Sequence, residues 1–500
     1  MKICRSCSVA VLGTAVLFSG CAVGPDFNRP EAPAVGGYTR DPLPGGTAAA
    51  GIAGGEEQKF VSDRDIPAQW WVLFRSPQLN ALIERALKNN PSVQAAQASL
   101  RQAQELLYSQ RGSYYPTVQA SLASSRQKAS ATVSPPLNSA ATLFNLHTAQ
   151  VTVGYTPDVF GGLRRQVESL QAQADSQRYL LEATYLTLSS NVVAAAVQEA
   201  GLRSQIAAAK DIIEINRKSL ELLRRQFAVG SVAGLDVAAQ EAAFAQSQQA
   251  LPPLQKQLEQ TRNLLSALAG RLPAEGGEGG FELAELHLPE ELPVSLPSKL
   301  VEQRPDVRAA EEQVHAASAA IGVAVANMLP QFTIDAAKGG TATIFSQMFA
   351  DGNPFWSVAA NATQTIFAGG TLLHRKRAAE AAYDQAAAQY RSTVITAFQN
   401  VADALYALQA DADALKAAVN SERAAKVSLD LVTKQLQVGQ VNFLALLNAQ
   451  QTYQQAVLSL SQVRASRFAG TAALFQALGG GWWNRQDAGA QATQVDSDRR

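Results

Sequence analysis

Two very long helical runs without a proline dominate this sequence. They extend over about residues 162–229 and 370–438, and both are rich in alanine, glutamine and leucine. At 1.5 Å per residue, a helix of about 68 residues reaches roughly 100 Å, far beyond a helix of an ordinary globular domain. Sparse apolar positions such as Leu170, Ala174 and Leu181 indicate a narrow coiled-coil seam rather than a broad core face. We therefore expect an elongated, mostly helical fold.

The chain also repeats itself. Three groups of residues recur at an offset of 207 to 214 positions, namely 90–93 with 304–307, 160–162 with 367–370, and 226–230 with 435–439. Each unit is predicted to hold a helix of about 25 residues, two strands, a helix of about 68, a glycine turn and a helix of about 35. Placed end to end, the two shorter helices could line the long one. We expect a first repeat at 61–270, an equatorial linker at 271–303 and a second repeat at 304–480.

The two repeats differ at a pair of prolines. Pro252 and Pro253 fall in the third helix of the first repeat, whereas the corresponding region around Ser461 has no proline. Proline lacks the amide donor and clashes with the preceding turn of a helix. We therefore expect this helix to be broken or kinked at the two prolines.

Four segments alternate apolar and polar residues, as strands with one apolar face do. The apolar positions are Val118, Ala120 and Leu122; Val151, Val153 and Tyr155; Phe332, Ile334 and Ala336; and Trp356, Val358, Ala360 and Ala362. A membrane β-barrel strand requires such a face over about ten residues. Four strands cannot close a barrel, whereas three copies of the chain supply twelve, so the pattern predicts an oligomer. The polar stretches 126–148 and 338–354 are expected to be loops outside the cell.

The N-terminus has the pattern of a lipoprotein signal. A basic start and a short apolar core end at Ser19-Gly20-Cys21, so residues 1–20 are expected to be removed. Cys21 would then carry an S-diacylglycerol group on its thiol and a palmitoyl chain on its amino group, and these would anchor it in outer-membrane lipid. The alternative is a plain secretory signal in which this cysteine is incidental. A Pro- and Gly-rich tether follows at 21–60.

Composition argues against catalysis and against nucleic-acid binding. The 42 Lys and Arg are balanced by 42 Asp and Glu, so no basic field is available for nucleic acid. The four histidines lack metal-ligand spacing, and the Gly-rich stretch 276–280 lacks the strand-to-helix context of a nucleotide site. Cys4 and Cys7 lie in the segment to be removed. We therefore expect no catalytic residue, no cofactor and no metal site.

No run of about 18 apolar residues after the signal marks a membrane helix. Strands are then the only elements expected to cross a membrane.

Several motifs together resemble the TolC-type outer membrane efflux factors, in their lipoprotein branch. They are residues 21–30, the segment from Trp70-Trp71 to Asn90, residues 304–311 and residues 321–324. Gln303 departs from the family, which often has an arginine there. The resemblance implies a mixed fold that is mostly α. A homotrimeric twelve-stranded outer-membrane β-barrel, with four strands per chain, would continue into a long periplasmic α-helical coiled-coil barrel. Residues 22–89, 271–303 and a C-terminal tail, flexible at 481–500, would supply most of a collar.

The resemblance also implies a function and partners. Family members conduct drugs, metals or other small molecules passively to the exterior. They receive them from an inner-membrane RND-type pump and its periplasmic membrane fusion (adaptor) protein. This component does no chemistry itself.

In this family the two helix-to-helix turns form the periplasmic tip, which acts as a gate. The matching residues are Gly230, Leu235 and Asp236 in the first turn, and Gly439, Leu444, Ala445 and Asn448 in the second. Asp236 stands where the family has an aspartate whose polar contacts keep the tip closed, although an ordinary helix N-cap would look the same. Some relatives carry two aspartates in the second turn that bind cations. Because Ala445 and Asn448 replace them here, that feature is not carried over.

Two other functions fit parts of the pattern. One is an outer membrane channel of an ABC-driven protein secretion system, and the lipoprotein motifs favour efflux over it. The other is a lipid-anchored coiled-coil scaffold without a pore, which explains the helices but not the four alternating strands. The sequence does not name a substrate, because specificity in these systems lies largely in the pump.

Overall fold

A computed structural model describes residues 22–128, 143–276 and 279–485 of the chain. The protein forms two compact units, and each draws on both halves of the sequence. The strand unit comprises Met1–Pro30, Leu100–Gln177 and Ala310–Tyr390, and the hairpin unit comprises Glu31–Ser99, Arg178–Ala309 and Arg391–Arg500. Cys21 and residues 486–500 lie outside the described residues, so the lipid anchor and a flexible tail at 486–500 stay predictions. The first residues of the tail expected at 481–500 are described, and they include the short helix η5 (Trp482–Asn484).

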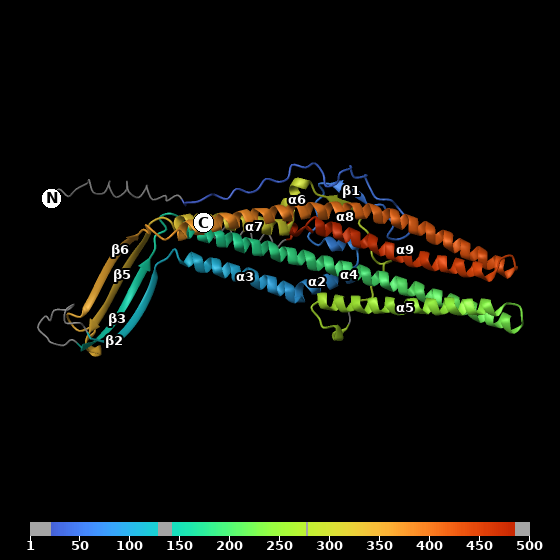
Figure 1. Ribbon diagram of the computed structural model, residues 1–500, viewed down its shortest axis with the longest axis horizontal. Helices are drawn as coiled ribbons and strands as arrows, with labels where there is room; N and C mark the ends of the chain where they lie inside the picture. Colours follow the sequence, from blue (N-terminus) through green and yellow to red (C-terminus); the bar gives the residue numbers. More distant parts are fainter. Residues whose placement is uncertain (1–21, 129–142, 277–278, 486–500) are drawn as a thin grey trace. The chain divides into compact units, whose positions relative to one another are not determined.

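Six helices form three pairs of equal length (Figure 1). The pairs are α3 (Pro91–Gly112) and α7 (Pro305–Ala326) with 22 residues each, α4 (Gly162–Ala228) and α8 (Thr371–Gln437) with 67, and α5 (Gly234–Leu268) and α9 (Phe443–Ala477) with 35. The long helices end within one residue of their expected positions, so that prediction is confirmed. Equal lengths are what a duplicated unit produces, while the domain boundaries themselves stay a prediction.

Proline marks several helix starts. It is the first residue of α3 and α7, and also of the shorter α2 (Pro77–Asn89) and α6 (Pro297–Gln303). The first turn of a helix has no internal partner for its amides, so the missing proline donor costs nothing there. Ser76 caps α2, because its Oγ accepts a hydrogen bond from the Leu79 amide at 3.3 Å.

Four antiparallel strands form the sheet of the strand unit (Figure 1). They are β2 (Thr117–Lys128), β3 (Leu143–Tyr155), β5 (Gln331–Ala342) and β6 (Pro354–Thr363), in the order β2-β3-β5-β6. Val118 pairs with Val153, which pairs with Ala336, which pairs with Val358. Paired residues share a face, so the apolar positions of all four strands lie on one face, as expected. β2 and β6 are the edges of this sheet.

The expected loop boundaries were wrong by several residues. β2 continues to Lys128, β3 already begins at Leu143, and β5 continues to Ala342, so the strands occupy both ends of the stretch 126–148 and the start of 338–354. Polar side chains do not end a strand, because the backbone ladder itself pairs Arg126 with Asn145 there.

Segments of the expected collar meet in the hairpin unit. β1 (Lys59–Ser62) pairs in parallel with β4 (Glu291–Val294), which joins the end of the tether to the linker. The short helix η2 (Trp70–Phe74) buries an aromatic cluster, in which Trp70 stacks on Phe475 of α9 with ring centroids 5.3 Å apart. The Trp70-Trp71 pair therefore packs, as aromatic anchors in a core do.

Pro252 and Pro253 do not break α5, which contradicts the expected break. The helix runs from Gly234 to Leu268 with both prolines inside it. Each proline removes one backbone hydrogen bond, but the flanking Leu251 and Leu254 pack against the buried cluster of Leu202, Ile206 and Leu258. Side-chain packing on both sides of the prolines offsets the lost bonds.

One helix in the described part of the chain, α4, is long and apolar enough over 18 residues to span a membrane by length and composition. The expectation that no such run exists was therefore too strict. More than half of that stretch is buried inside the protein, as in the core helix of a packed bundle.

Arg467 of α9 is fully buried and fastens the N-terminal tether to the hairpin unit. Its Nη2 donates to Thr47 Oγ1 at 2.6 Å and its Nη1 to the Leu408 carbonyl at 2.7 Å. Thr47 Oγ1 in turn accepts from the Gln58 amide at 3.0 Å. Burial lowers the pKa of Arg467 to about 10, because a charge is poorly solvated there.

We expect Arg467→Met to loosen the tether. The substitution removes the guanidinium hydrogen bonds to the Leu408 carbonyl and the Thr47 hydroxyl, and a lost hydrogen bond from a charged group costs about 1.5–3 kcal/mol. Hydrogen exchange at the Gln58 amide should accelerate accordingly. Arg423→Met, the same substitution at an exposed position of α8, is the control and should leave Gln58 unchanged. Equal exchange in both variants would contradict this role.

Candidate functional site

Both turns at the end of the long helices have the same hydrogen-bond geometry. In the first, the Gly230 amide donates to the Phe227 carbonyl and the Ser231 amide donates to the Gln226 carbonyl, each at 2.9 Å. In the second, the amides of Gly439 and Gln440 make the equivalent bonds to Leu436 and Gln435. This pair of bonds is the Schellman motif, which requires a left-handed residue after the helix. Gly230 and Gly439 supply it with φ of 75° and 74°.

The helices that follow begin differently. α5 has Ala233 at its N-cap and no side-chain cap, so the interpretation of Asp236 as the N-cap was wrong. Asp236 is instead the third residue of the helix, where its charge favours the positive end of the helix dipole. α9 is capped by Asn442, whose Oδ1 accepts from the Ala445 amide at 3.0 Å.

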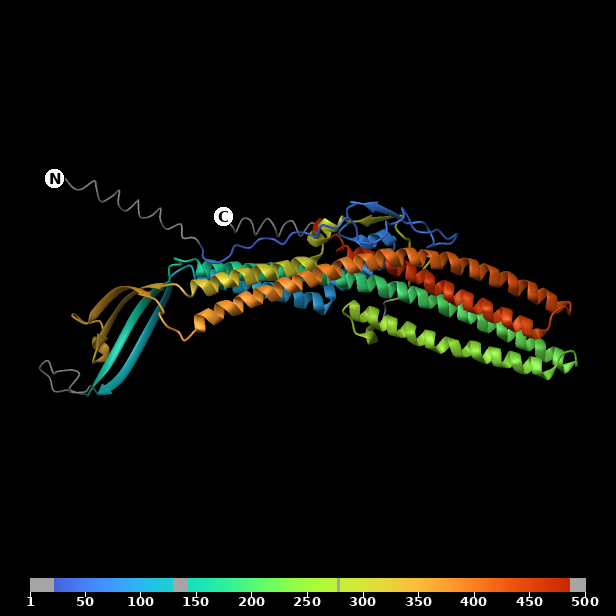
Figure 2. The same cartoon turned by 45° about the horizontal axis from the view of Figure 1, so that its top comes forward.

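The two helical hairpins pack together near their turns, as Figure 2 shows for the α4–α5 and α8–α9 pairs. Leu223 of α4 is buried against Phe443 and Leu446 of α9, and apolar residues of α5, α8 and α9 surround them. Gln450 Nε2 also donates to Ser219 Oγ at 3.3 Å, from α9 to α4. Both sets of predicted tip residues are therefore brought to one end of the hairpin unit.

Several apolar side chains at this end remain exposed. Val229 is 79% exposed and Leu235 is 78% exposed in the first turn, and Val438 is 70% and Leu444 60% exposed in the second. Scattered exposed leucines need no explanation, but a group at one end of a molecule marks a surface that another protein can cover. We call these four residues the tip patch.

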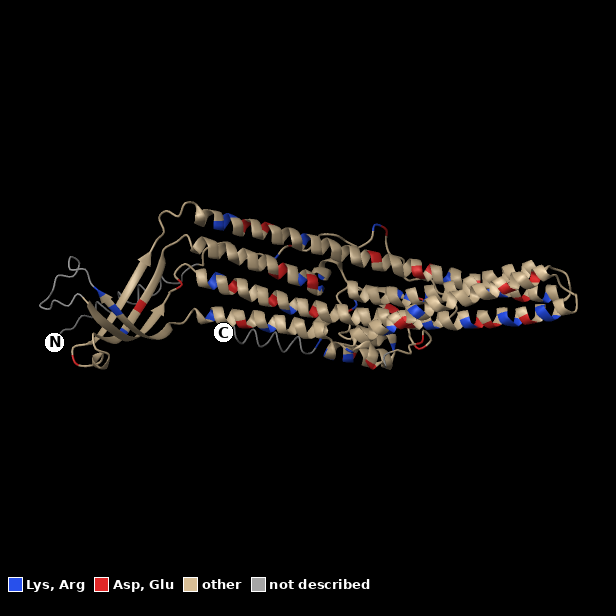
Figure 3. Ribbon diagram, turned by 60° about the horizontal axis from the view of Figure 1, so that its bottom comes forward, with Lys and Arg blue, Asp and Glu red and all other residues tan. Residues whose placement is uncertain are grey.

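The two turns differ in charge. Figure 3 shows charged residues along the helices of both hairpins, where Arg224 of α4 pairs with Glu241 of α5 at 2.6 Å. Asp236 is half-buried near the start of α5, whereas residues 438–448 contain no charged residue. Asn448 is exposed and Ala445 is half-buried.

We expect Gly230→Ala to destabilise the first turn locally. An added Cβ meets no other atom there, so the whole cost is the left-handed backbone, about 1–2 kcal/mol. Hydrogen exchange at the Ser231 amide should rise by roughly 5- to 30-fold. Gly112→Ala at the end of α3 is the control, since that glycine also has open space but no positive φ. A similar change in local hydrogen exchange in both variants would contradict this explanation of the turn.

The described residues nearest to Cys21 are held by a buried arginine of the strand unit. Arg165 of α4 donates from Nε to the Val23 carbonyl at 3.1 Å and from Nη2 to Asp26 Oδ1 at 2.6 Å. The Val23 amide donates to the Phe160 carbonyl at 3.1 Å. The backbone of Gly24 lies so close to that of Gly322 that a side chain at position 24 would collide with it. The chain is thus tied to α4 and α7 within a few residues of the expected anchor.

A histidine completes this N-terminal clamp. The His315 ring stacks on Phe27 with centroids 4.4 Å apart, and its Nε2 lies 3.1 Å from Glu168 Oε1. Its Nδ1 lies 3.3 Å from Glu312 Oε2. The hydrogen bond with Glu312, together with that to Glu168, raises the pKa of His315 against the opposing effect of burial.

We expect the clamp to weaken as pH rises. A pKa raised in the folded state means that the stabilisation is complete below the unfolded value of about 6.5 and is lost as pH rises through the folded value. After correction for intrinsic rates, hydrogen exchange at the Val23 amide should accelerate through that range. His315→Gln should remove the pH dependence, so a wild-type profile in that variant would disprove the role of this ring.

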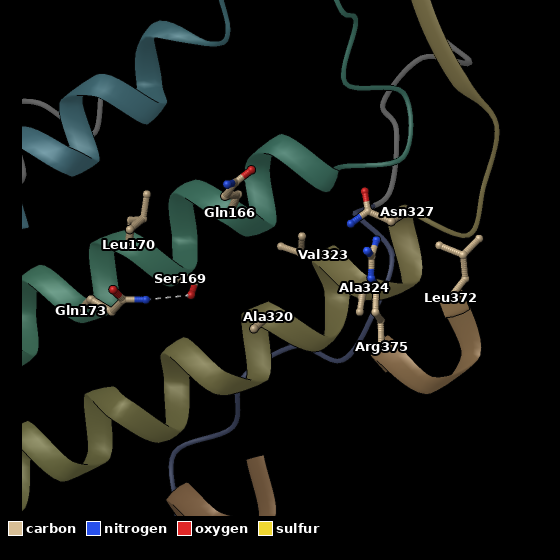
Figure 4. A pocket seen from close by; sticks show the side chains of 10 residues that line it. All are labelled: Gln166, Ser169, Leu170, Gln173, Ala320, Val323, Ala324, Asn327, Leu372 and Arg375. Carbon is tan, nitrogen blue, oxygen red and sulfur yellow. Dashed lines mark hydrogen bonds between the residues drawn. The ribbon is translucent and has the colours of Figure 1, made fainter. Parts of the chain in front are cut away.

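The strand unit also contains a crevice of about 390 Å³ between α4, α7 and the start of α8 (Figure 4). Its lining combines Gln166, Gln173, Asn327 and Arg375 with apolar side chains such as Leu170. Gln173 Nε2 donates to Ser169 Oγ at 3.4 Å beside it. Among the described residues, no group of His, Cys, Asp and Glu is placed to hold a metal ion.

The sequence did not predict the contacts of Arg165, His315 and Arg467, nor the N-cap of α9. Arg165, His315 and Arg467 act through partners far away in the chain, and no local pattern marks them. Asn442 carried a readable signal, since asparagine is a preferred N-cap and it stands immediately before the apolar start of α9.

Comparison with known proteins identifies the family. The family model described as Outer membrane efflux protein matches residues 82–271 and 296–480. The chain belongs to this family. The match covers both helical hairpins and all four strands of the sheet, so the TolC-type resemblance is confirmed.

Similar proteins extend over nearly the whole chain. The pyoverdine export outer membrane protein OpmQ of Pseudomonas putida is 30% identical over 450 residues, which cover 88% of this chain and 94% of OpmQ. The toluene efflux pump outer membrane protein TtgC of Pseudomonas putida is 28% identical over 487 residues, covering 97% of this chain and 98% of TtgC.

Solved structures of outer-membrane channels are also similar to this chain. The outer-membrane channel OprN has a TM-score of 0.82 at 27% identity, covering 92% of this chain and all of OprN. The open state of the Neisseria gonorrhoeae MtrE outer membrane channel has a TM-score of 0.78 at 25% identity, covering 92% and 99%. This efflux family member therefore belongs to the outer membrane and extends into the periplasm, and its relatives are channels rather than enzymes.

Proposed function

We propose that this protein is the homotrimeric outer membrane conduit of a tripartite efflux pump. It passes small molecules from an inner-membrane RND-type pump and a periplasmic adaptor protein to the exterior, without chemistry of its own. OpmQ and TtgC are named for the export of pyoverdine and the efflux of toluene. Those names favour small molecules over proteins as cargo, and so favour efflux over ABC-driven secretion.

The sheet carries the argument for a trimer. One face of it carries the apolar positions of all four strands, and the other carries Thr, Ser, Gln and Asn. The edges β2 and β6 are unpaired on one side within the described chain. In a membrane every backbone N–H and C=O needs a partner, so β2 of one copy must pair with β6 of the next. Three copies then form a twelve-stranded barrel with the apolar face toward lipid.

The tip patch is the proposed adaptor site. Val229, Leu235, Val438 and Leu444 give an apolar surface at the hairpin turns, and the second turn adds no charge to desolvate. An adaptor with apolar residues at its own end could cover it. Asp236, half-buried in the first turn of α5, is the residue that we propose for polar contacts that hold the tip closed.

The N-terminal clamp supports a lipid anchor at Cys21. Arg165 holds Val23 and Asp26 beside the start of α4, and α4 follows β3 of the sheet in the chain. Diacylglyceryl and palmitoyl chains on Cys21 would therefore enter the same membrane as the strands. Two acyl signals of this kind give stable anchoring.

Conductance tests the proposal. Purified protein should have the mass of a trimer in native mass spectrometry and should give steady ion conductance in a planar bilayer. Expression in a strain lacking its own channel should restore tolerance to toxic pump substrates. Trimers that never conduct would favour the scaffold function instead, and restored protein export without drug tolerance would favour secretion.

Two neighbouring substitutions provide a matched control. Val358 lies on the apolar face of β6 and Ser357 on the other face. Val358→Lys places a charge toward lipid, at a cost of roughly 2–4 kcal/mol near the bilayer centre, and should reduce inserted trimer. Ser357→Lys should insert normally. Equal insertion of both variants would contradict the assignment of the faces.

A further inference from the structure

The register of the sheet places each strand residue on the apolar or the polar face. Ala120, Val151, Lys338 and Trp356 are joined by consecutive pairings, so Lys338 lies in a row of the apolar face. Lys338 is exposed beside Trp356, which is 77% exposed. Lys338 thus lies in a row of the apolar face whose other three residues are apolar.

A second row lies farther from the helices, where the strands lead into their connections. Ser124 pairs with His147, which pairs with Ala342, and Ser124 Oγ lies 2.7 Å from His147 Nδ1. Arg126 and Lys128 follow on the same face of β2, both exposed.

In the described residues of β2, β3, β5 and β6, the basic and the acidic side chains therefore lie on opposite faces of the sheet. The basic side chains, all on the apolar face, are Arg126, Lys128, His147 and Lys338. The carboxylate of these strands, Asp335, lies on the polar face and accepts from Asn361 Nδ2 at 3.4 Å. Asp351 in the β5–β6 connection is the other acid nearby, and the sequence between β2 and β3 has none. Positive charge on the apolar face consequently has no carboxylate beside it in these strands.

The β5–β6 connection folds back over the same face. The backbone of Met348 covers Gly340, where a side chain would come within 2.1 Å of the Met348 carbonyl oxygen. The ring of Phe345 meets His147 edge-on, with centroids 5.6 Å apart. Phe345 and Phe349 are 56% and 66% exposed. Apolar surface thus continues to the level of the basic residues.

This combination fits one kind of partner. A cation facing hydrocarbon is costly, but the cost falls toward the headgroups, where long side chains reach out of the apolar layer. Guanidinium and ammonium groups bind phosphate oxygens well, and a lipid supplies phosphate and acyl chains together. We propose that the outer end of the apolar face binds the phosphate-bearing headgroup of an anionic lipid. Arg126 and Lys128, two residues apart on β2, contact the phosphate, while Phe345 and Phe349 lie against the acyl chains.

This site rests on the proposed barrel, because the apolar face meets lipid only when the sheet closes. The test therefore uses the full chain as trimers, reconstituted in vesicles of phosphatidylcholine with or without phosphatidic acid. Protection of the strands from protease reports insertion. Native mass spectrometry of the extracted trimers reports which lipid is retained.

We expect the wild type to retain phosphatidic acid in preference to phosphatidylcholine. The double variant Arg126→Gln, Lys128→Gln should lose roughly 25-fold of that preference, because each basic residue near an anionic surface contributes about fivefold. The control keeps the charge at the same positions with Arg126→Lys and Lys128→Arg, and it should keep the preference.

The outcomes separate the two proposals. Inserted trimers in which the Gln variant retains phosphatidic acid as well as the wild type would overturn the lipid site and leave the conduit intact. Displacement of the lipid by inorganic phosphate would also overturn it, since a free anion would then be the ligand. Failure of the wild type to insert would overturn the barrel and the site together.

Discussion

Backbone hydrogen bonding in the four-stranded sheet is the constraint on which the rest of this protein depends. Within one chain, β2 and β6 each leave one side of their backbone unpaired. Water could satisfy those groups, but hydrocarbon cannot. In the proposed barrel, neighbouring copies of the chain supply the missing backbone partners. The proposed roles of the apolar face, of the basic residues on it and of the β5–β6 connection all rest on that closure.

The helices meet a different requirement, since their backbones are satisfied internally. Their difficulty lies at the turns, where the last carbonyls lose their partners. Gly230 and Gly439 solve it with identical Schellman motifs, which let two 67-residue helices reverse within a few residues. A turn of only a few residues is too small to bury its own apolar side chains. The hairpins therefore bury part of that surface against each other and expose the rest as the tip patch.

Two buried arginines hold the N-terminal segment, one in each compact unit. Arg165 binds the backbone at Val23, and Arg467 binds Thr47. Guanidinium suits this task because it offers several donors in a fixed plane and stays charged when desolvated. A segment without regular structure gains fixed hydrogen bonds from these two points. The acidic partner Asp26 and the pair of glutamates around His315 make the first clamp the more electrostatic of the two.

The sequence by itself determined the elements whose signals are local. The 3.6-residue and 2-residue periodicities predicted the long helices and the apolar face of the strands, and glycine predicted both turns. Tertiary structure decided what depends on partners distant in the chain. α5 continues through Pro252 because neighbouring leucines pack, and strand pairing extends past the apolar residues. The clamps likewise form only when segments more than 130 residues apart meet. Periodicity records which face of an element is buried, but it does not record which residue will lie opposite it.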